Sequence, residues 1–171
     1  MSTQRVLVLA FGNPGRRDDG LGPALAAELE RLDLPGVTVQ ADYQLSVEDA
    51  AAVAEHDAVI FVDAACSGPE PFAYRRLTPQ PGLGFSSHSV SPAGVLALAE
   101  ELFQARPQGY LLAIRGYEFD EFGEGLSAAA QANLVAAVRF LQSILRKRTL
   151  SEGAGPAACV AGAAAPSSGD R

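Results

Sequence analysis

Three polar side chains stand where apolar segments of the chain end, and their types could support metal chemistry. Asp19 follows the apolar run 5–10 through a glycine-rich turn, Asp63 closes the run 58–62, and His88 precedes a helix-start signal. In open α/β sheets, ligands bind at the carboxyl ends of the strands. Two carboxylates and an imidazole suit a divalent transition ion. The spacing therefore predicts a metal site formed by these three side chains.

The turn that carries Asp19 is rich in glycine, but it does not match a phosphate-binding loop. Its sequence, Gly12-Asn13-Pro14-Gly15-Arg16-Arg17-Asp18-Asp19-Gly20-Leu21-Gly22, contains neither G-x-G-x-x-G nor G-x-x-x-x-G-K. Two carboxylates at the start of a helix would also compete with a phosphate for its N–H groups. One aspartate at a helix start commonly caps the helix. We expect Asp18 to cap the helix or orient its neighbours, which leaves Asp19 free to face the sheet edge.

Each of the other two candidates has a simpler alternative. Asp63 is followed by a loop of small residues, where an aspartate often forms a hydrogen bond within its own turn. On position alone, this structural role and a functional role are equally well supported. A lone histidine usually bonds backbone. His88, however, lies among Ser86, Ser87 and Ser89, which offer the hydrogen bonds that fix the tautomer of a ligating imidazole. The other histidine, His56, is expected to be solvated in a polar turn.

A nucleophilic mechanism is the less favoured alternative. Cys66 or one of the serines beside His88 would have to attack, with the histidine as base. The chain has no G-x-S-x-G elbow, and those serines belong to the segment that carries the histidine. Cys66 is more simply a small buried residue that packs beside Asp63. The metal-centred hypothesis is therefore preferred.

Five segments have the composition of strands. The runs 5–10, 58–62 and 110–114 are apolar without alternation, as in strands that are buried on both faces of a parallel sheet. The segment 37–41 is a further strand. The segment 72–77 alternates, which predicts a strand near a sheet edge, with an antiparallel direction left open.

Helical periods lie between these strands. Leucines from Leu21 to Leu32 share one face, and Ser46 to Asp49 resembles a capping box before a short helix through Ala54. Ser91-Pro92 begins a helix that runs to about Gln104, and Ser127 caps a last helix whose basic end is Arg146-Lys147-Arg148. Alternation of strands and helices predicts a three-layer α/β/α fold with a mainly parallel twisted sheet.

Length and composition limit the remaining possibilities. The 171 residues suit one domain over residues 1–150, and the Ala-, Gly-, Pro- and Ser-rich segment 151–171 is expected to be a disordered tail. A net charge of −7 disfavours nucleic acid and anionic lipid as partners. Two cysteines make no disulfide framework, and no signal peptide or membrane span is expected. We therefore expect a cytoplasmic protein.

The motifs together resemble the [NiFe]-hydrogenase maturation endopeptidases over residues 5–148. The resemblance is carried by G-N-P-x-x-x-D-D-G-x-G, V-D-A-x-x-S-G and S-S-H-S-x-S-P, and by the later Gly116-Tyr117-Glu118-Phe119 and Gly125-Leu126-Ser127. It implies that Asp19, Asp63 and His88 contact the metal and carry the catalysis. Where the family often has Asp-Glu, this chain has Asp18-Asp19, which shortens the second ligand by one methylene.

The resemblance also implies an activity, which is removal of the C-terminal extension of a [NiFe]-hydrogenase large-subunit precursor after nickel insertion. Nickel would arrive with this substrate, and another divalent ion such as zinc could replace it in vitro. The enzyme is expected to be a monomer. Two alternatives remain: a non-enzymatic nickel-binding accessory protein, and a peptidyl-tRNA hydrolase-like esterase. The second is disfavoured because Arg16-Arg17-Asp18-Asp19 stands where that family has its catalytic histidine, and because the chain is acidic.

Overall fold

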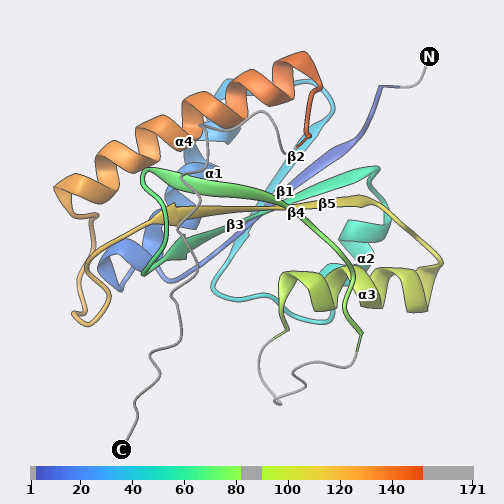
Figure 1. The fold of residues 1–171 in the computed structure, drawn as a ribbon, viewed down its shortest axis with the longest axis horizontal. Coiled ribbons are helices and arrows are strands. Elements are labelled where there is room, and N and C mark those ends of the chain that lie inside the picture. The colour runs from blue at the N-terminus through green and yellow to red at the C-terminus, as the bar shows by residue number, and fades with distance from the viewer. Residues whose placement is uncertain (1–2, 82–89, 152–171) are drawn as a thin grey trace, which may run out of the picture.

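Five strands form one sheet in the computed structural model, which describes residues 3–81 and 90–151 (Figure 1). The order across the sheet is β2-β1-β3-β5-β4. The strands β2, β1, β3 and β5 run parallel to one another, and β4 runs antiparallel to β5 at the edge. The strands are β1 (Val6–Phe11), β2 (Val37–Asp42), β3 (Ala58–Ala65), β4 (Phe72–Leu77) and β5 (Gln108–Arg115). The predicted mainly parallel sheet is confirmed, and the direction of its edge strand is now fixed.

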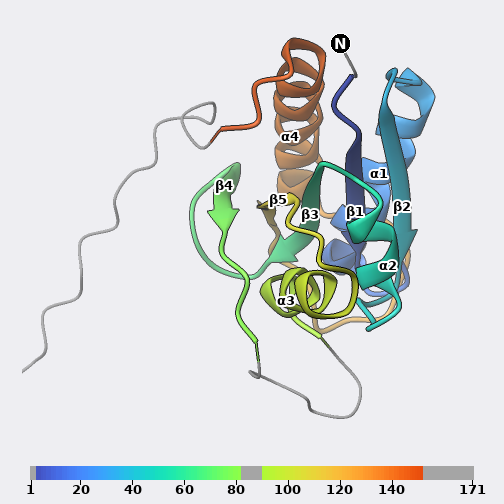
Figure 2. The ribbon, with the colours of Figure 1, turned by 90° about the vertical axis from the view of Figure 1, so that its right-hand side faces the viewer.

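Helices cover both faces of this sheet, which gives the predicted three layers (Figure 2). The helices are η1 (Arg17–Gly20), a short 3-10 turn, and α1 (Leu21–Leu32), α2 (Asp49–Ala54), α3 (Pro92–Phe103) and α4 (Ala128–Lys147). Alternate residues of β1 point to opposite faces. Val6 and Val8 pack with α1 and α4, whereas Leu7 and Leu9 pack with α2 and α3. Each face therefore has its own apolar core.

Short polar side chains define the starts of the helices, largely as predicted. Ser91 Oγ accepts a hydrogen bond from the Gly94 N–H at 3.0 Å, and Ser127 Oγ accepts one from the Ala130 N–H at 3.2 Å. Before α2, only half of the expected capping box forms, because the Asp49 carboxylate accepts from the Ser46 N–H but no side chain caps the helix. These bonds satisfy N–H groups that a helix start leaves free.

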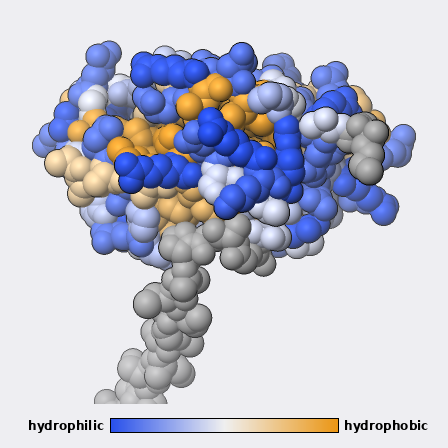
Figure 3. All heavy atoms as spheres, turned by 90° about the horizontal axis from the view of Figure 1, so that it is seen from above, coloured by the Kyte–Doolittle hydropathy of each residue, from blue (hydrophilic) through white to orange (hydrophobic). Residues whose placement is uncertain are grey.

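The last helix, α4, is the longest described helix and packs as part of the core. By length and composition alone it is the one helix within residues 3–81 and 90–151 that could cross a membrane. Its buried face, with Leu134, Leu141 and Leu145, contacts the cluster shared with α1 and the sheet. On the outer face of α4, Val135 is 42% exposed. Seen from this side, the surface shows apolar residues among hydrophilic ones (Figure 3). This pattern is typical of a core helix.

One strand continues further than expected, and the extension involves a candidate residue. β3 runs to Ala65, three residues beyond the predicted end, because β5 continues alongside it. Asp63 consequently lies within the strand and pairs in register with Ala113. Its side chain direction is therefore set by the sheet.

Candidate functional site

The turn between β1 and α1 is built by unusually close backbone packing. Gly12 has φ of 145°, and a Cβ at this position would lie 2.1 Å from the carbonyl oxygen of Asp19. A Cβ at Gly22 would lie 2.5 Å from the carbonyl oxygen of Phe11. Side chains at these two positions would collide with backbone, so glycine is required at both. The turn thereby holds η1, with both aspartates, against the end of β1.

Asp18 is completely buried and anchors the segment that precedes α4. Its Oδ2 accepts hydrogen bonds from the N–H groups of Tyr117 (2.7 Å) and Glu118 (2.9 Å). Ser127 donates twice, from its N–H to Oδ1 and from its hydroxyl to Oδ2, both at 2.7 Å. Burial raises the pKa of Asp18, but these hydrogen bonds together outweigh it and hold the pKa below its usual value. Asp18 is therefore a buried, ionised anchor.

This result corrects part of the prediction for Asp18. The side chain does not cap the helix that follows it, since neither η1 nor α1 has a side-chain cap. Instead it binds the loop 116–127, about a hundred residues further along the chain. The same loop binds the turn through its backbone, where Gly123 accepts from the Arg17 N–H at 2.9 Å and donates to the Gly15 carbonyl at 2.8 Å. An orienting role for Asp18 is supported, and a capping role is wrong.

Asp19 and Asp63 both lie at the carboxyl edge of the sheet, where the charge of Asp19 acts on Asp63. Asp19 is half-buried, and its Oδ2 accepts a hydrogen bond from the Asn13 N–H at 2.8 Å. Asp63 is also half-buried, and its Oδ1 accepts from the N–H of its own neighbour, Ala64, at 2.8 Å. Burial and, to a smaller extent, the negative charge of Asp19 together raise the pKa of Asp63 to about 6, against the lowering effect of the Ala64 hydrogen bond. Two predicted site residues thus interact electrostatically.

The Asp19 and Asp63 carboxylates have no cationic partner among residues 3–81 and 90–151. The ion pairs formed there involve neither side chain. Hydrogen bonds to backbone N–H groups leave oxygen lone pairs free on both carboxylates. Oxygen donors of like charge favour binding of a cation or a proton. The pair therefore suits a divalent ion, although no group of three metal-ligating side chains exists within the described part of the chain.

His88, the third predicted ligand, lies outside the described residues, as do Ser86, Ser87 and Ser89. The described chain resumes at Val90, which packs against the core cluster of α2 and α3. Asp63 has the same parity along β3 as Phe61, which belongs to that cluster, so its side chain lies on this face of the sheet. The contact between His88 and the aspartates stays a prediction.

Two other side chains differ from their expectations. Cys66 is exposed rather than buried, because β3 has already ended and the chain has left the sheet. His56 is half-buried rather than solvated. Its Nδ1 lies 2.7 Å from the Ala52 carbonyl oxygen and its Nε2 lies 3.2 Å from Thr38 Oγ1, so it ties α2 to β2.

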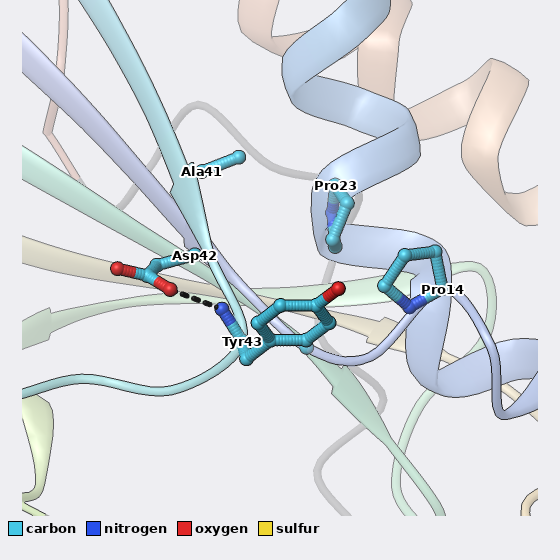
Figure 4. Close-up of a pocket in the computed structure, with 6 residues that line it drawn as sticks. Pro14, Pro23, Ala41, Asp42 and Tyr43 are labelled. Atoms are coloured by element: carbon cyan, nitrogen blue, oxygen red, sulfur yellow. Dashed lines mark hydrogen bonds between the residues drawn. The ribbon is translucent and has the colours of Figure 1, made fainter.

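A hollow of about 180 Å³ opens beside the turn, and sequence patterns gave no sign of it (Figure 4). It lies between the turn, the first residues of α1 and the end of β2. The ring of Tyr43, the residue that follows β2, extends toward Pro14 and Pro23. These residues meet only because β2 pairs with β1, so periodicity along the chain carries no signal for the hollow.

The comparisons with known proteins concern the fold. The sequence matches no protein-family model and no curated protein. Among solved structures, the [NiFe] hydrogenase maturation protease HycI from Thermococcus kodakarensis KOD1 is similar with a TM-score of 0.67 and 23% identity, over 84% of this chain and 93% of that chain. The hydrogenase maturating endopeptidase HybD from E. coli has a TM-score of 0.63 and 21% identity, over 86% and 95%. The chain has the fold of the hydrogenase maturation proteases.

A third solved structure agrees with the first two. The hydrogenase 2 maturation peptidase from Thaumarchaeota archaeon SCGC_AB-539-E09 has a TM-score of 0.59 and 22% identity, over 82% of this chain and 98% of that one. All three likenesses cover more than four fifths of this chain.

Proposed function

We propose that this chain is an endopeptidase that removes the C-terminal extension of a [NiFe]-hydrogenase large-subunit precursor after nickel insertion. The observation that carries the proposal is the pair formed by Asp19 and Asp63, two interacting carboxylates without a cationic counterpart among the described residues. The likeness to structures of hydrogenase maturation proteases supports the same activity. The enzyme would act in the cytoplasm and as a monomer.

In this proposal the two carboxylates and His88 bind the nickel that the precursor carries. Such an ion would serve as a recognition handle and supply a Lewis acid for the scissile carbonyl. The Asn13 N–H holds one oxygen of Asp19 and the Ala64 N–H holds one oxygen of Asp63, so each carboxylate is oriented before the substrate arrives. Asp18 is a positioning residue, since it fixes η1 through the loop 116–127 and its carboxylate oxygens are taken up by the donors of that loop.

The decisive experiment is a gel-shift processing assay with matched precursors. Chelator-treated, desalted enzyme is mixed with nickel-loaded or metal-free precursor, and casein serves as a generic protein substrate. We expect one cut near the C-terminus of the nickel-loaded precursor and no cut in the other two. Equal cleavage of both precursors would reject nickel as the recognition signal. Cleavage that requires metal added to the enzyme would indicate an ordinary metallopeptidase.

The same assay tests the site residues. Asp19→Asn, Asp63→Asn and His88→Ala should each reduce the processing rate by at least about a hundredfold, the usual scale for loss of a catalytic group. Asp33→Asn is the matched control, because Asp33 is exposed at the far end of α1 in a left-handed conformation that asparagine tolerates. Tight binding of nickel-loaded precursor without cleavage would favour the accessory-protein alternative.

A further inference from the structure

The hollow beside the β1–α1 turn is apolar and its walls are rigid. Two prolines and a glycine form much of it, and the ring of Tyr43 stands over it although this residue is 68% exposed. Proline and closely packed glycine leave little freedom for the walls to rearrange. The lining consists of Gly12, Pro14, Pro23, Ala41, Asp42 and Tyr43 (Figure 4). The hollow is thus preformed.

This hollow adjoins the candidate catalytic site directly. Gly12 is part of its wall, and the next residue, Asn13, donates its N–H to the Asp19 carboxylate at 2.8 Å. Gly12 itself packs on the backbone of Asp19, since a Cβ at Gly12 would lie 2.1 Å from the Asp19 carbonyl oxygen. A group in the hollow and a group bound at Asp19 would therefore be neighbours, as adjacent residues of one substrate chain are.

The volume matches a single side chain. A protein cavity of about 150 Å³ accommodates one benzene molecule. The 180 Å³ here is therefore enough for one branched aliphatic or aromatic side chain, and too little for a folded element. An apolar lining with few polar groups is typical of such binding sites.

The strand beside the hollow can also bind the backbone of a ligand. β2 is an edge strand, with β1 on one side and no strand on the other among the described residues. The Asp42 carbonyl accepts from the Gly12 N–H at 3.0 Å, so it faces β1, and the main-chain groups of Ala41 face the open side. An extended segment laid along that edge can pair with them, as in β-strand addition.

We propose that the hollow is a specificity pocket that binds one apolar side chain of an extended substrate segment, next to the bond that is cut. This inference rests on the proposed peptidase function for its biological meaning. The rigid apolar walls select the side chain, and the open edge of β2 aligns the segment. The Asp19 carboxylate is held beside the wall by the N–H of Asn13, which follows Gly12. A polar side chain in that place would lose its hydration without gaining a partner.

Binding is tested without any cleavage, by NMR of the full ¹⁵N-labelled chain. The probes are two acetylated, amidated pentapeptides, Gly-Gly-Leu-Gly-Gly and Gly-Gly-Ser-Gly-Gly. The leucine probe should shift the amide signals of Gly12, Ala41 and Tyr43 in a saturable way, at least tenfold more tightly than the serine probe. Equal effects of both probes, or leucine-dependent shifts elsewhere only, would overturn the pocket.

Two substitutions separate the pocket from the fold. Ala41→Trp should fill the hollow and abolish the leucine-specific shifts, and Tyr43→Ser, at an exposed position, should weaken them. Ala132→Trp on the outer face of α4 is the matched control and should leave them unchanged. Persistence of the shifts in Ala41→Trp would contradict the proposal.

A processing assay then distinguishes this proposal from the function on which it rests. Ala41→Trp should lower kcat/KM for the nickel-loaded precursor at least tenfold, while Ala132→Trp should match the unmodified chain. Wild-type rates in Ala41→Trp would reject the pocket and leave the peptidase intact. Leucine-specific shifts without any precursor cleavage would retain the pocket and reject the peptidase.

Discussion

Two aspartates at the same end of the sheet have opposite environments. Asp18 is fully buried, yet four hydrogen bonds lower its pKa. Asp63 is only half-buried, accepts one hydrogen bond from its own neighbour, and has its pKa raised to about 6 by burial and by Asp19. The number of donors, rather than the depth of burial, therefore decides which carboxylate stays charged. Asp18 is fully hydrogen-bonded within the protein, whereas Asp63 has oxygen lone pairs free to bind a ligand.

The two pKa shifts affect stability in opposite directions. Asp18 has a lowered pKa, so it contributes stability above the ordinary aspartate pKa, and this contribution is lost as the pH falls through its folded value. Asp63 has a raised pKa, so the folded state binds the extra proton and stability falls as the pH rises from about 4 to about 6. Substitutions at the two positions should therefore have effects of opposite sign.

The largest effect is expected for Asp18→Ala. Removal of the buried carboxylate leaves the partly buried N–H groups of Tyr117, Glu118 and Ser127 without their acceptor, at about 1 to 3 kcal/mol for each. We expect the free energy of unfolding in urea to fall by about 3 to 5 kcal/mol at pH 7. Glu28→Ala, an exposed position on α1, should change it by less than about 0.5 kcal/mol. A loss below 1 kcal/mol for Asp18→Ala would contradict the anchoring role.

Ser127→Ala should produce a smaller loss from the same network. The Ser127 hydroxyl donates to Asp18 and also accepts from the Ala130 N–H at the start of α4. Loss of both bonds should lower the free energy of unfolding by about 2 kcal/mol. In the double variant with Asp18→Ala, the two losses should add up to less than their sum, because the residues share one contact. Strict additivity would show that they act independently.

Asp63→Asn should instead stabilise the protein. An uncharged amide removes the cost of a half-buried carboxylate, which we place at about 1 kcal/mol after allowing for solvent exposure. The gain should be absent near pH 4, appear as the pH rises to about 6, and stay constant above it. Urea unfolding at pH 4, 6 and 8 measures this. A gain at pH 4 equal to that at pH 8 would be inconsistent with the raised pKa.

The smallest effect is expected for truncation after Leu150. Leu150 is 5% exposed, and its carbonyl accepts a hydrogen bond from the Tyr74 hydroxyl at 2.8 Å. A chain that ends at this residue should unfold within about 0.5 kcal/mol of the full chain and keep its processing activity. A chain that ends at Arg148 should be less stable by about 1 to 2 kcal/mol, since it loses this buried leucine. Equal stability of both truncated chains would show that the folded domain ends at or before Arg148, without a contribution from Leu150.

Local sequence predicted the elements well because their signals are local. Alternation in the segment 72–77 indicated an edge strand, and Ser91 and Ser127 were identified as caps from their own neighbourhoods. Unbroken apolar runs marked the central strands. Each of these features depends on a few consecutive residues, which is the range over which periodicity and capping act.

The site was predictable only in part, because its contacts are distant along the chain. The placement of Asp19 and Asp63 at the same edge of the sheet followed from the rule that parallel strands end at one edge. The role of Asp18 did not follow, since its donors lie 99 to 109 residues away. The exposure of Cys66 depended on where β3 ends, which register with β5 determines. No local pattern encodes either fact.

The hydrogen bonds of Asp18 also determine at which point in the synthesis of the chain the site can form. The turn with both aspartates is made within the first 20 residues, whereas Tyr117, Glu118 and Ser127 emerge much later. Contacts of such large sequence separation close late in folding, since the loop between them must lose its entropy first. A nascent chain that carries β1 to β3 therefore still lacks a fixed turn. The carboxylate edge becomes complete only after the segment before α4 has docked, so we expect an unfinished chain to lack the proposed activity.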